Sequence, residues 1–384
     1  MKMKKLTSVK PVNLALTVLF CAGLIVVFTA LFFIPDSDFS VTEKRVLTLF
    51  PKATLSSVAD GSFERDVEKY LQDQVPFRNF FVGVASYTGQ LLGQNGTEGV
   101  YRCRDDYLIN TPVEFDEKKL SNNLKRLNDF VRDRDIGKYM MIVPQTGYIM
   151  DDKLPKNHSS YNDDGIFDFI RKTADEFTFV DLRESFKDQK DDVQLYYKTD
   201  HHWTMDGAFI GMNEFLKAAG RPCVAKSDFS IEKHTGFYGT THSTSALWLT
   251  PPDSMELWNY DDADISVTVR DIGVETVTTR NDVYFKEHLT EYDMYPVYLN
   301  GNHSFTHIVN NNADGGALLI IKDSFGNSLA SQLVASYKDI IMVDLRYYRT
   351  EAVSDILVEY PIDTVLVNYG LDNLINDTNF IWLR

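Results

Sequence analysis

The sequence contains little cysteine. Three cysteines in 384 residues, Cys21, Cys103 and Cys223, are too few for a disulfide scaffold, and none has the spacing of a zinc site. Cys21 lies in an apolar segment, so only Cys103 and Cys223 could pair in the body of the protein, and sequence leaves open whether they do. The fold must therefore depend on a hydrophobic core, for which an apolar content of 44% is sufficient. No cofactor is expected.

Positive charge is also scarce. The net charge is −16, and the only charges in the first 34 residues are Lys2, Lys4, Lys5 and Lys10, so the remainder of the chain carries −20. A body with this excess of acid repels phosphate backbones. We therefore expect no nucleic-acid partner.

Residues 14–34 contain no charge over 21 positions. A helix of that length spans roughly 30 Å, the thickness of a bilayer core. Because the lysines precede this segment, the positive-inside rule places the short N-terminus in the cytoplasm and the body outside. A cleaved signal peptide is the alternative, but the run is long for one and no small-x-small pair follows it. We predict a single-pass signal anchor in the cell membrane, with an extracytoplasmic body.

The rest of the chain has no internal repeat or low-complexity tract, and strand and helix patterns alternate along much of it, as in a parallel α/β sheet. Between residues 225 and 312 helical periodicity is weak and β-branched residues are dense. The predicted organisation has six parts: 1–11 cytoplasmic, 12–34 transmembrane, 35–95 a stalk and helical segment, 96–224 the first part of the α/β domain, 225–312 a β-rich insertion, and 313–384 the second part.

Ser324 lies three positions after the five-residue apolar strand pattern 317–321 and opens a helical pattern. A serine there lies at the carboxyl edge of a sheet, near free backbone N–H groups and the positive end of a helix dipole, which stabilise an oxyanion. Serine is a weak nucleophile and needs a general base. Taken alone, a helix N-cap explains Ser324 equally simply.

The run Asp200-His201-His202-Trp203 could supply that base. In extended chain, residues two apart point the same way, so Asp200 and His202 can face one site while His201 faces elsewhere. A carboxylate that orients one imidazole nitrogen leaves the other to accept a serine proton. Trp203 could pack beside the imidazole or contact substrate. A pair of surface histidines before a helix is the plainer alternative.

The same residues could instead bind metal, since Asp, His and His are good ligands. A metal-dependent phosphoesterase needs further carboxylates at strand ends. Asp262 and Asp264 have suitable spacing but precede a strand rather than follow one.

Arg346 and Asn368 follow the two later strand patterns, so parallel strands would bring both to the sheet edge that carries Ser324. Either could donate a hydrogen bond to an oxyanion or to substrate. A salt bridge for Arg346 and a turn for Asn368 are the structural alternatives.

These residues resemble the DHHW family, which is named for the run 200–203. The resemblance extends over nearly the whole body through short motifs in a fixed order: 43–45, 73–78, 143–144, 153–155, 199–204, 236–240 and 322–324. The family is similar to the SGNH-hydrolase-like proteins of alginate and cell-wall polysaccharide O-acetylation. One departure is Lys322 before Asp323-Ser324, where a Gly-Asp-Ser motif has glycine.

The resemblance implies a flavodoxin-like SGNH fold, with Ser324 as nucleophile, His202 as base and Asp200 as orienting acid. It implies an O-acyltransferase or esterase that acts on a cell-surface or exported polysaccharide, with acyl groups supplied by a multi-pass membrane-bound O-acyltransferase. Two alternatives stay open: a non-catalytic component of a polysaccharide modification or export complex, and the metal-dependent phosphoesterase.

Overall fold

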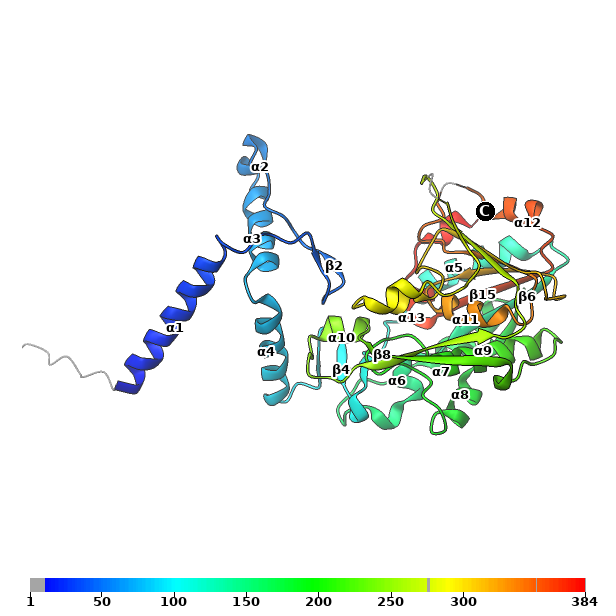
Figure 1. The fold of residues 1–384 in the computed structure, drawn as a ribbon, viewed down its shortest axis with the longest axis horizontal. Coiled ribbons are helices and arrows are strands. Elements are labelled where there is room, and N and C mark those ends of the chain that lie inside the picture. Colours follow the sequence, from blue (N-terminus) through cyan, green and yellow to red (C-terminus); the bar gives the residue numbers. More distant parts are fainter. Residues whose placement is uncertain (1–10, 275–276, 350, 384) are drawn as a thin grey trace, which may run out of the picture. The chain divides into compact units, whose positions relative to one another are not determined.

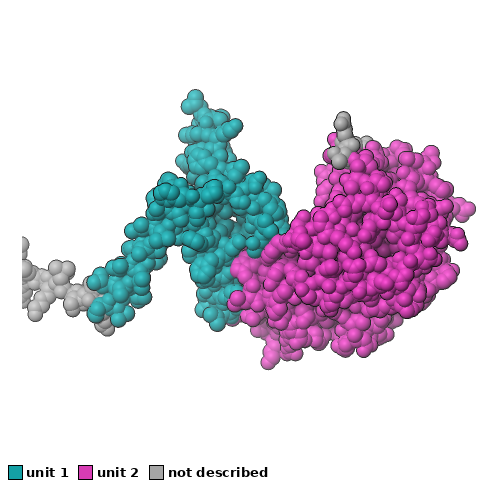
Figure 2. All heavy atoms as spheres, viewed as in Figure 1, with its two compact units in different colours: residues 1–92 teal, residues 93–384 magenta. Residues whose placement is uncertain are grey.

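The computed structural model describes residues 11–274, 277–349 and 351–383. The chain forms two compact units, residues 1–92 and residues 93–384, which Figure 2 colours separately. All residues proposed from sequence for the reaction lie in the second unit.

The first unit begins with one long helix, α1 (Pro11–Ala30), none of whose residues is buried. With a mean hydropathy of 2.4 over its most apolar window, α1 is the one helix in the described chain long and apolar enough to cross a membrane. It fits a single-pass anchor or a signal sequence. The other elements of this unit are short: β1 (Phe39–Ser40), β2 (Arg45–Val46), α2 (Leu55–Ala59), α3 (Ser62–Gln74) and α4 (Arg78–Leu91).

Ion pairs join two separate motifs within the first unit. Arg45 binds the Asp73 carboxylate at 2.6 Å and the Glu43 carboxylate at 2.6 Å, and Arg78 also pairs with Glu43. The hydrogen bond from Arg45 lowers the pKa of Asp73 to about 2. Motifs 43–45 and 73–78 of the family resemblance therefore form one cluster.

The second unit is built on an eight-stranded sheet (Figure 1), in the order β11-β10-β12-β14-β13-β15-β6-β7. The five strands from β14 to β7 are parallel, and β12, β10 and β11 add to them in antiparallel pairing. Their bounds are β6 (Gly137–Val143), β7 (Thr178–Asp181), β10 (Ile265–Arg270), β11 (Val277–Arg280), β12 (Phe305–Asn310), β13 (Ala317–Lys322), β14 (Asp339–Val343) and β15 (Thr364–Gly370).

Helices cover both faces of this sheet, which explains why β13 is apolar from Ala317 to Ile321. Leu318 and Ile320 belong to one core with α8 (Arg183–Gln189), α9 (Met205–Ala218) and α11 (Phe325–Leu333). Leu319 and Ile321 belong to the other. That second core includes α5 (Glu117–Val131), α7 (Asp163–Thr173), α12 (Val353–Glu359) and α13 (Leu371–Asn376).

The predicted β-rich segment 225–312 is largely continuous with the main sheet. It supplies β10, β11 and β12, and β12 pairs with β14, which would otherwise be an edge strand. It also forms an antiparallel ribbon of β8 (Phe229–Phe237) and β9 (Asp253–Tyr260), joined through α10 (Thr240–Ser245). A small sheet of β3 (Gly96–Thr97), β4 (Val100–Arg102) and β5 (Leu108–Asn110), with α6 (Thr146–Ile149), completes the unit.

The cysteine pairing left open by the sequence does not form, because Cys103 and Cys223 are both free thiols. Burial raises the pKa of the Cys103 thiol to about 12. Cys103 is therefore a protonated packing residue rather than a nucleophile.

The topology reverses at β13, at the edge where Ser324 lies. The chain leaves β13 through α11 to β14 on one side, then passes through α12 to β15 on the other side of β13. Such a switch point at the carboxyl ends of parallel strands is where open α/β sheets bind ligands.

Candidate active site

Ser324 occupies the turn between β13 and α11. Its backbone is helical (φ −65°, ψ −20°), and its side chain does not cap the helix. The N-cap alternative therefore does not account for the hydroxyl. The Ser324 backbone N–H makes no hydrogen bond within the described part of the chain, so it is available at the positive end of α11.

The loop that carries Asp200 and His202 is closed by a bridge between Tyr196 and Trp203. The buried Asp253 carboxylate fixes this loop by accepting hydrogen bonds from the backbone N–H groups of Lys198 (3.0 Å) and Thr199 (2.7 Å). It also accepts one from the Thr199 hydroxyl at 2.6 Å. The loop is thus held at its start before it reaches the candidate residues.

Asp200, His202 and Ser324 form one chain of hydrogen bonds. His202 Nδ1 lies 2.5 Å from Asp200 Oδ1, and His202 Nε2 lies 2.7 Å from Ser324 Oγ. Because an ionised carboxylate can only accept, we assign the proton to Nδ1, which leaves Nε2 to accept from the Ser324 hydroxyl. Asp200 and His202 are only 2% and 4% exposed, so little water competes for these bonds.

Both oxygens of Asp200 are occupied. Oδ1 also accepts from the His202 backbone N–H at 2.9 Å, while Oδ2 accepts from the Thr240 N–H at 2.6 Å and its hydroxyl at 3.0 Å. Gly239 allows α10 to approach this closely, because a Cβ there would lie 2.1 Å from Asp200 Cβ. Sequence reasoning did not identify Thr240 as a site residue, although its motif 236–240 was part of the family resemblance.

Aromatic rings enclose His202. Tyr295 stacks on the imidazole with ring centroids 4.0 Å apart, and its hydroxyl donates to the Ser324 backbone carbonyl at 3.1 Å. Phe325 lies 4.8 Å from the imidazole by ring centroids. Tyr295 also escaped prediction, since it lies in the segment 225–312 and no motif links it to the site.

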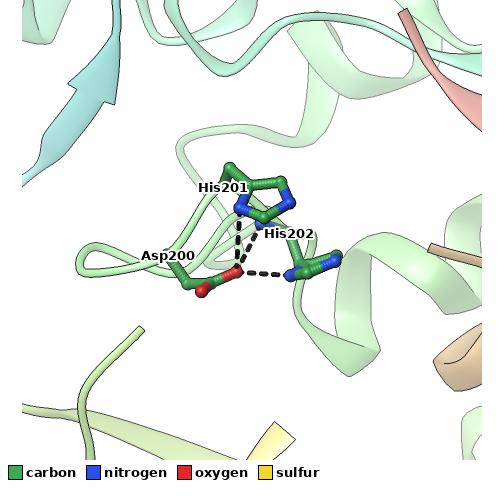
Figure 3. A group of neighbouring side chains, drawn as sticks. All are labelled: Asp200, His201 and His202. Carbon is green, nitrogen blue, oxygen red and sulfur yellow. Dashed lines mark hydrogen bonds and ion pairs between the residues drawn. The ribbon is translucent and has the colours of Figure 1, made fainter. Parts of the chain in front are cut away.

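The alternation of side chains predicted that His201 faces away from the site. In the structure it faces the site instead. Figure 3 shows the Asp200 carboxylate facing both imidazole rings from one side, and His201 Nδ1 lies 3.6 Å from Asp200 Oδ1 and 2.6 Å from Thr240 Oγ1. The imidazole of His201 packs 3.9 Å from that of His202. The tight loop, rather than an extended strand, brings consecutive side chains together.

Trp203 does not fit the predicted contact with substrate. Its side chain is fully buried, and its indole N–H donates to Ser328 Oγ on α11 at 2.8 Å. The aromatic residue belongs to the core because the Tyr196 bridge draws the chain inward at this point. Trp203 thus links the His202 loop to the helix that follows Ser324.

Arg346 and Asn368 reach the same edge of the sheet, but within the described chain the side chain of neither makes a hydrogen bond to Ser324 or His202. Arg346 binds the buried Asp344 carboxylate through Nε (2.8 Å) and Nη2 (2.5 Å), which is the salt-bridge alternative. Asn368 lies within β15 and donates to the Met141 carbonyl at 3.3 Å. Their predicted oxyanion role has no contact to support it in this conformation.

Asp323 is a further residue that sequence reasoning left without a role. Its buried carboxylate accepts from the Phe325 N–H (2.9 Å), the Gly370 N–H (2.9 Å) and Asn373 Nδ2 (2.7 Å). Burial raises the pKa of Asp323. One side chain thus connects the Ser324 turn with the end of β15 and the start of α13.

A metal ion could in principle bind to Asp200, His201 and His202, since these residue types are metal ligands and their ligand atoms lie within 4.8 Å of one another. The donors are already committed to the hydrogen bonds described above, however. Asp262 and Asp264, the carboxylates that a phosphoesterase site would need, bind Asn312 and Asn311 at the opposite edge of the sheet, near the start of β14. The residues present do not fit the metal-dependent alternative.

Comparisons with known proteins agree with this fold. Residues 122–343 match the family described as DHHW protein. A structure of Bacillus cereus PatB1 with a sulfonyl adduct is 24% identical, with a TM-score of 0.63 over 74% of this chain and 100% of that one. A DHHW family protein from Eubacterium siraeum is 20% identical, with a TM-score of 0.64 over 74% and 94%. No curated protein matches the sequence. The predicted α/β fold class is confirmed.

Proposed function

Because this chain belongs to the DHHW family, we propose that it is a serine-dependent O-acyltransferase or esterase that acts on a polysaccharide outside the cell. The observation that carries the proposal is the hydrogen-bonded chain from Asp200 through His202 to Ser324. Such a chain activates a serine hydroxyl for attack on an ester carbonyl. Helix α1 would anchor the protein, with its body outside the membrane.

In the acylation step, Ser324 Oγ attacks the carbonyl carbon of an acyl ester while its proton passes to His202 Nε2. Asp200 stabilises the resulting imidazolium through the bond at Nδ1, and the Ser324 N–H at the start of α11 is placed to donate to the oxyanion. When the intermediate collapses, the leaving alcohol takes the proton from His202, and the acyl group stays on Ser324 as an ester.

In the second step, a hydroxyl of the acceptor attacks that ester. His202 removes its proton and returns it to Ser324 Oγ as the acyl group leaves. A sugar hydroxyl as acceptor gives transfer, and water gives hydrolysis. A multi-pass membrane-bound O-acyltransferase is the acyl supplier that the family resemblance implies.

The sulfonyl adduct of PatB1 suggests the experiment. Sulfonyl fluorides react with activated nucleophiles, so phenylmethylsulfonyl fluoride should label Ser324 of the detergent-solubilised full chain stoichiometrically. Mass spectrometry of peptides locates the label. Ser324→Ala should lose the label and about 10³-fold of p-nitrophenyl acetate hydrolysis.

Matched controls separate loss of chemistry from loss of fold. Ser331→Ala removes another buried hydroxyl of α11, and His234→Ala removes a histidine on β8, outside the site. Both should keep labelling and hydrolysis, whereas His202→Ala should lose both with an unchanged circular dichroism spectrum. Unlabelled Ser324 in the folded wild type would instead favour a non-catalytic component of a polysaccharide complex.

A further inference from the structure

A cleft of about 180 Å³ opens beside the proposed nucleophile. Phe325, which follows Ser324, and His201, which packs on His202, both line it. The remaining wall comes from the ends of β5, β6 and β15 and from the first residues of α6 and α13. Its polar side chains are Asn110, Gln145, Thr146, His201, Asp372 and Asn373.

The cleft has both polar and apolar lining residues and carries no fixed positive charge. None of its lining residues, all of which the structure describes, is lysine or arginine. Lysine and arginine are the usual side-chain partners of carboxylates and phosphates, so this lining offers no such partner to a uronic acid or a sugar phosphate. Ile109, Leu371 and Phe325 add apolar surface, so the lining suits a ligand with hydroxyl groups on an otherwise apolar ring.

Two of the amides are already fixed by the protein. Gln145 donates to Asp163 Oδ1 at 2.7 Å and accepts from the Val113 N–H at 2.8 Å. Asn373 donates to Asp323 at 2.7 Å. These side chains shape the wall and do not need a ligand to complete them.

Asp372 differs from them. Its Oδ1 is buried and has no hydrogen-bond partner in the part of the chain that the structure describes. Leaving such an atom unpaired is unfavourable, and a ligand hydroxyl in the cleft would supply the missing hydrogen bond. Burial, and then the nearby Asp163 and Asp323 carboxylates, raise the pKa of Asp372 to about 7.

From these observations, and resting on the proposed acyl transfer, we propose that the cleft is the acceptor subsite. Asp372 binds a hydroxyl group of a neutral sugar ring and disfavours uronic acids and phosphorylated sugars. Asp323 holds this wall and the Ser324 turn together through Gly370 and Asn373. The bound hydroxyl is therefore presented at a fixed distance from the acyl group.

The first test measures how acyl-enzyme partitions between sugar and water, which does not depend on how fast Ser324 is acylated. The full chain is supplied with p-nitrophenyl acetate and either a neutral β-1,4-glucan oligomer or an oligouronate, and acetylated sugar is counted by mass spectrometry. Wild type should acetylate the neutral oligomer in preference. Asp372→Leu should lower its transfer-to-hydrolysis ratio about tenfold, since an unreplaced hydrogen bond to substrate costs about that much.

Two variants sharpen the assignment. Asp372→Asn keeps groups that donate and accept, so transfer to the neutral oligomer should stay within about threefold while rejection of the oligouronate weakens. Asp355→Asn, on the exposed side of α12, should match wild type for both acceptors. An unchanged partition ratio in Asp372→Leu, or a wild-type preference for the oligouronate, would overturn the subsite.

A binding measurement tests the acceptor subsite independently of the proposed acyl-transfer reaction. The neutral oligomer should bind the Ser324→Ala chain in isothermal titration calorimetry, and Asp372→Leu in that background should weaken its affinity about tenfold. If Ser324 proves unreactive but this binding difference holds, the acyl-transfer function fails and the sugar site stands. Equal affinity in the two chains would reject the site, whatever the activity.

Discussion

The proposed reaction centre around His202 and the cleft beside it share a wall at Phe325 and His201, yet one carboxylate in each is in the opposite state. Both oxygens of Asp200 and both ring nitrogens of His202 have hydrogen-bond partners. In the cleft, Asp372 Oδ1 has none within the described chain. A proton relay needs every group fixed in one tautomer, whereas a binding site needs groups that only the ligand completes.

The largest expected effect comes from disturbing the occupied centre. Asp200→Asn replaces an acceptor by an amide that can donate, which favours the wrong His202 tautomer. Hydrolysis of p-nitrophenyl acetate should fall about 10³-fold or more, measured as kcat/KM on the full chain. Asp261→Asn, an exposed residue after β9, should leave the rate unchanged. A loss of less than tenfold would mean that Asp200 does not orient the base.

A smaller effect is expected from substituting Tyr295. Two variants separate its ring stacking on His202 from its hydrogen bond to the Ser324 carbonyl. Tyr295→Phe keeps the ring on His202 but removes the hydroxyl bond to the Ser324 carbonyl, worth about 1 kcal/mol. Tyr295→Leu also removes the stacking. Activity should fall about fivefold in the first and further in the second, with urea unfolding as the check on stability. Equal activity in the two variants would show that the stacking of Tyr295 on His202 does not contribute to the rate.

The smallest effect concerns the cleft and pH. The pKa of Asp372 is raised to about 7 in the folded chain, so its contribution to stability is present below the unfolded pKa of about 4 and is lost as pH rises through 7. Asp163 and Asp323 face it and titrate with it. The Tm of wild type should therefore fall more between pH 4 and 7 than that of Asp372→Asn. Parallel Tm curves for the two chains would contradict the raised pKa.

The parts of the fold that could be predicted were those with a local pattern. The apolar runs at 317–321 and 364–367 lie within β13 and β15, since strands covered on both faces are apolar throughout. The placement of Ser324 after β13 followed from the same pattern. The pairing of β12 with β14 could not be predicted, because antiparallel partners distant in sequence leave no local pattern.

The side chains of the site divide in the same way. Asp200 and His202 were proposed because a carboxylate and an imidazole two residues apart can meet locally. Thr240, the first residue of α10, lies 40 residues from Asp200, and Tyr295 lies 29 residues from Ser324, so no local spacing identifies them. For Arg346 the sequence left a salt bridge and an oxyanion role open, and the structure shows the guanidinium paired with Asp344, two residues earlier.

The three bonds of Asp323 have a consequence for engineering. They attach α13 to the Ser324 turn through only two positions, Gly370 and Asn373. The buried Leu371, Leu374 and Ile375 hold the same helix to the core, so only positions 372 and 376 of α13 are open to exchange between family members. With the anchors and the core residues retained, the catalytic turn would stay in register, and acceptor choice would follow the residue at position 372.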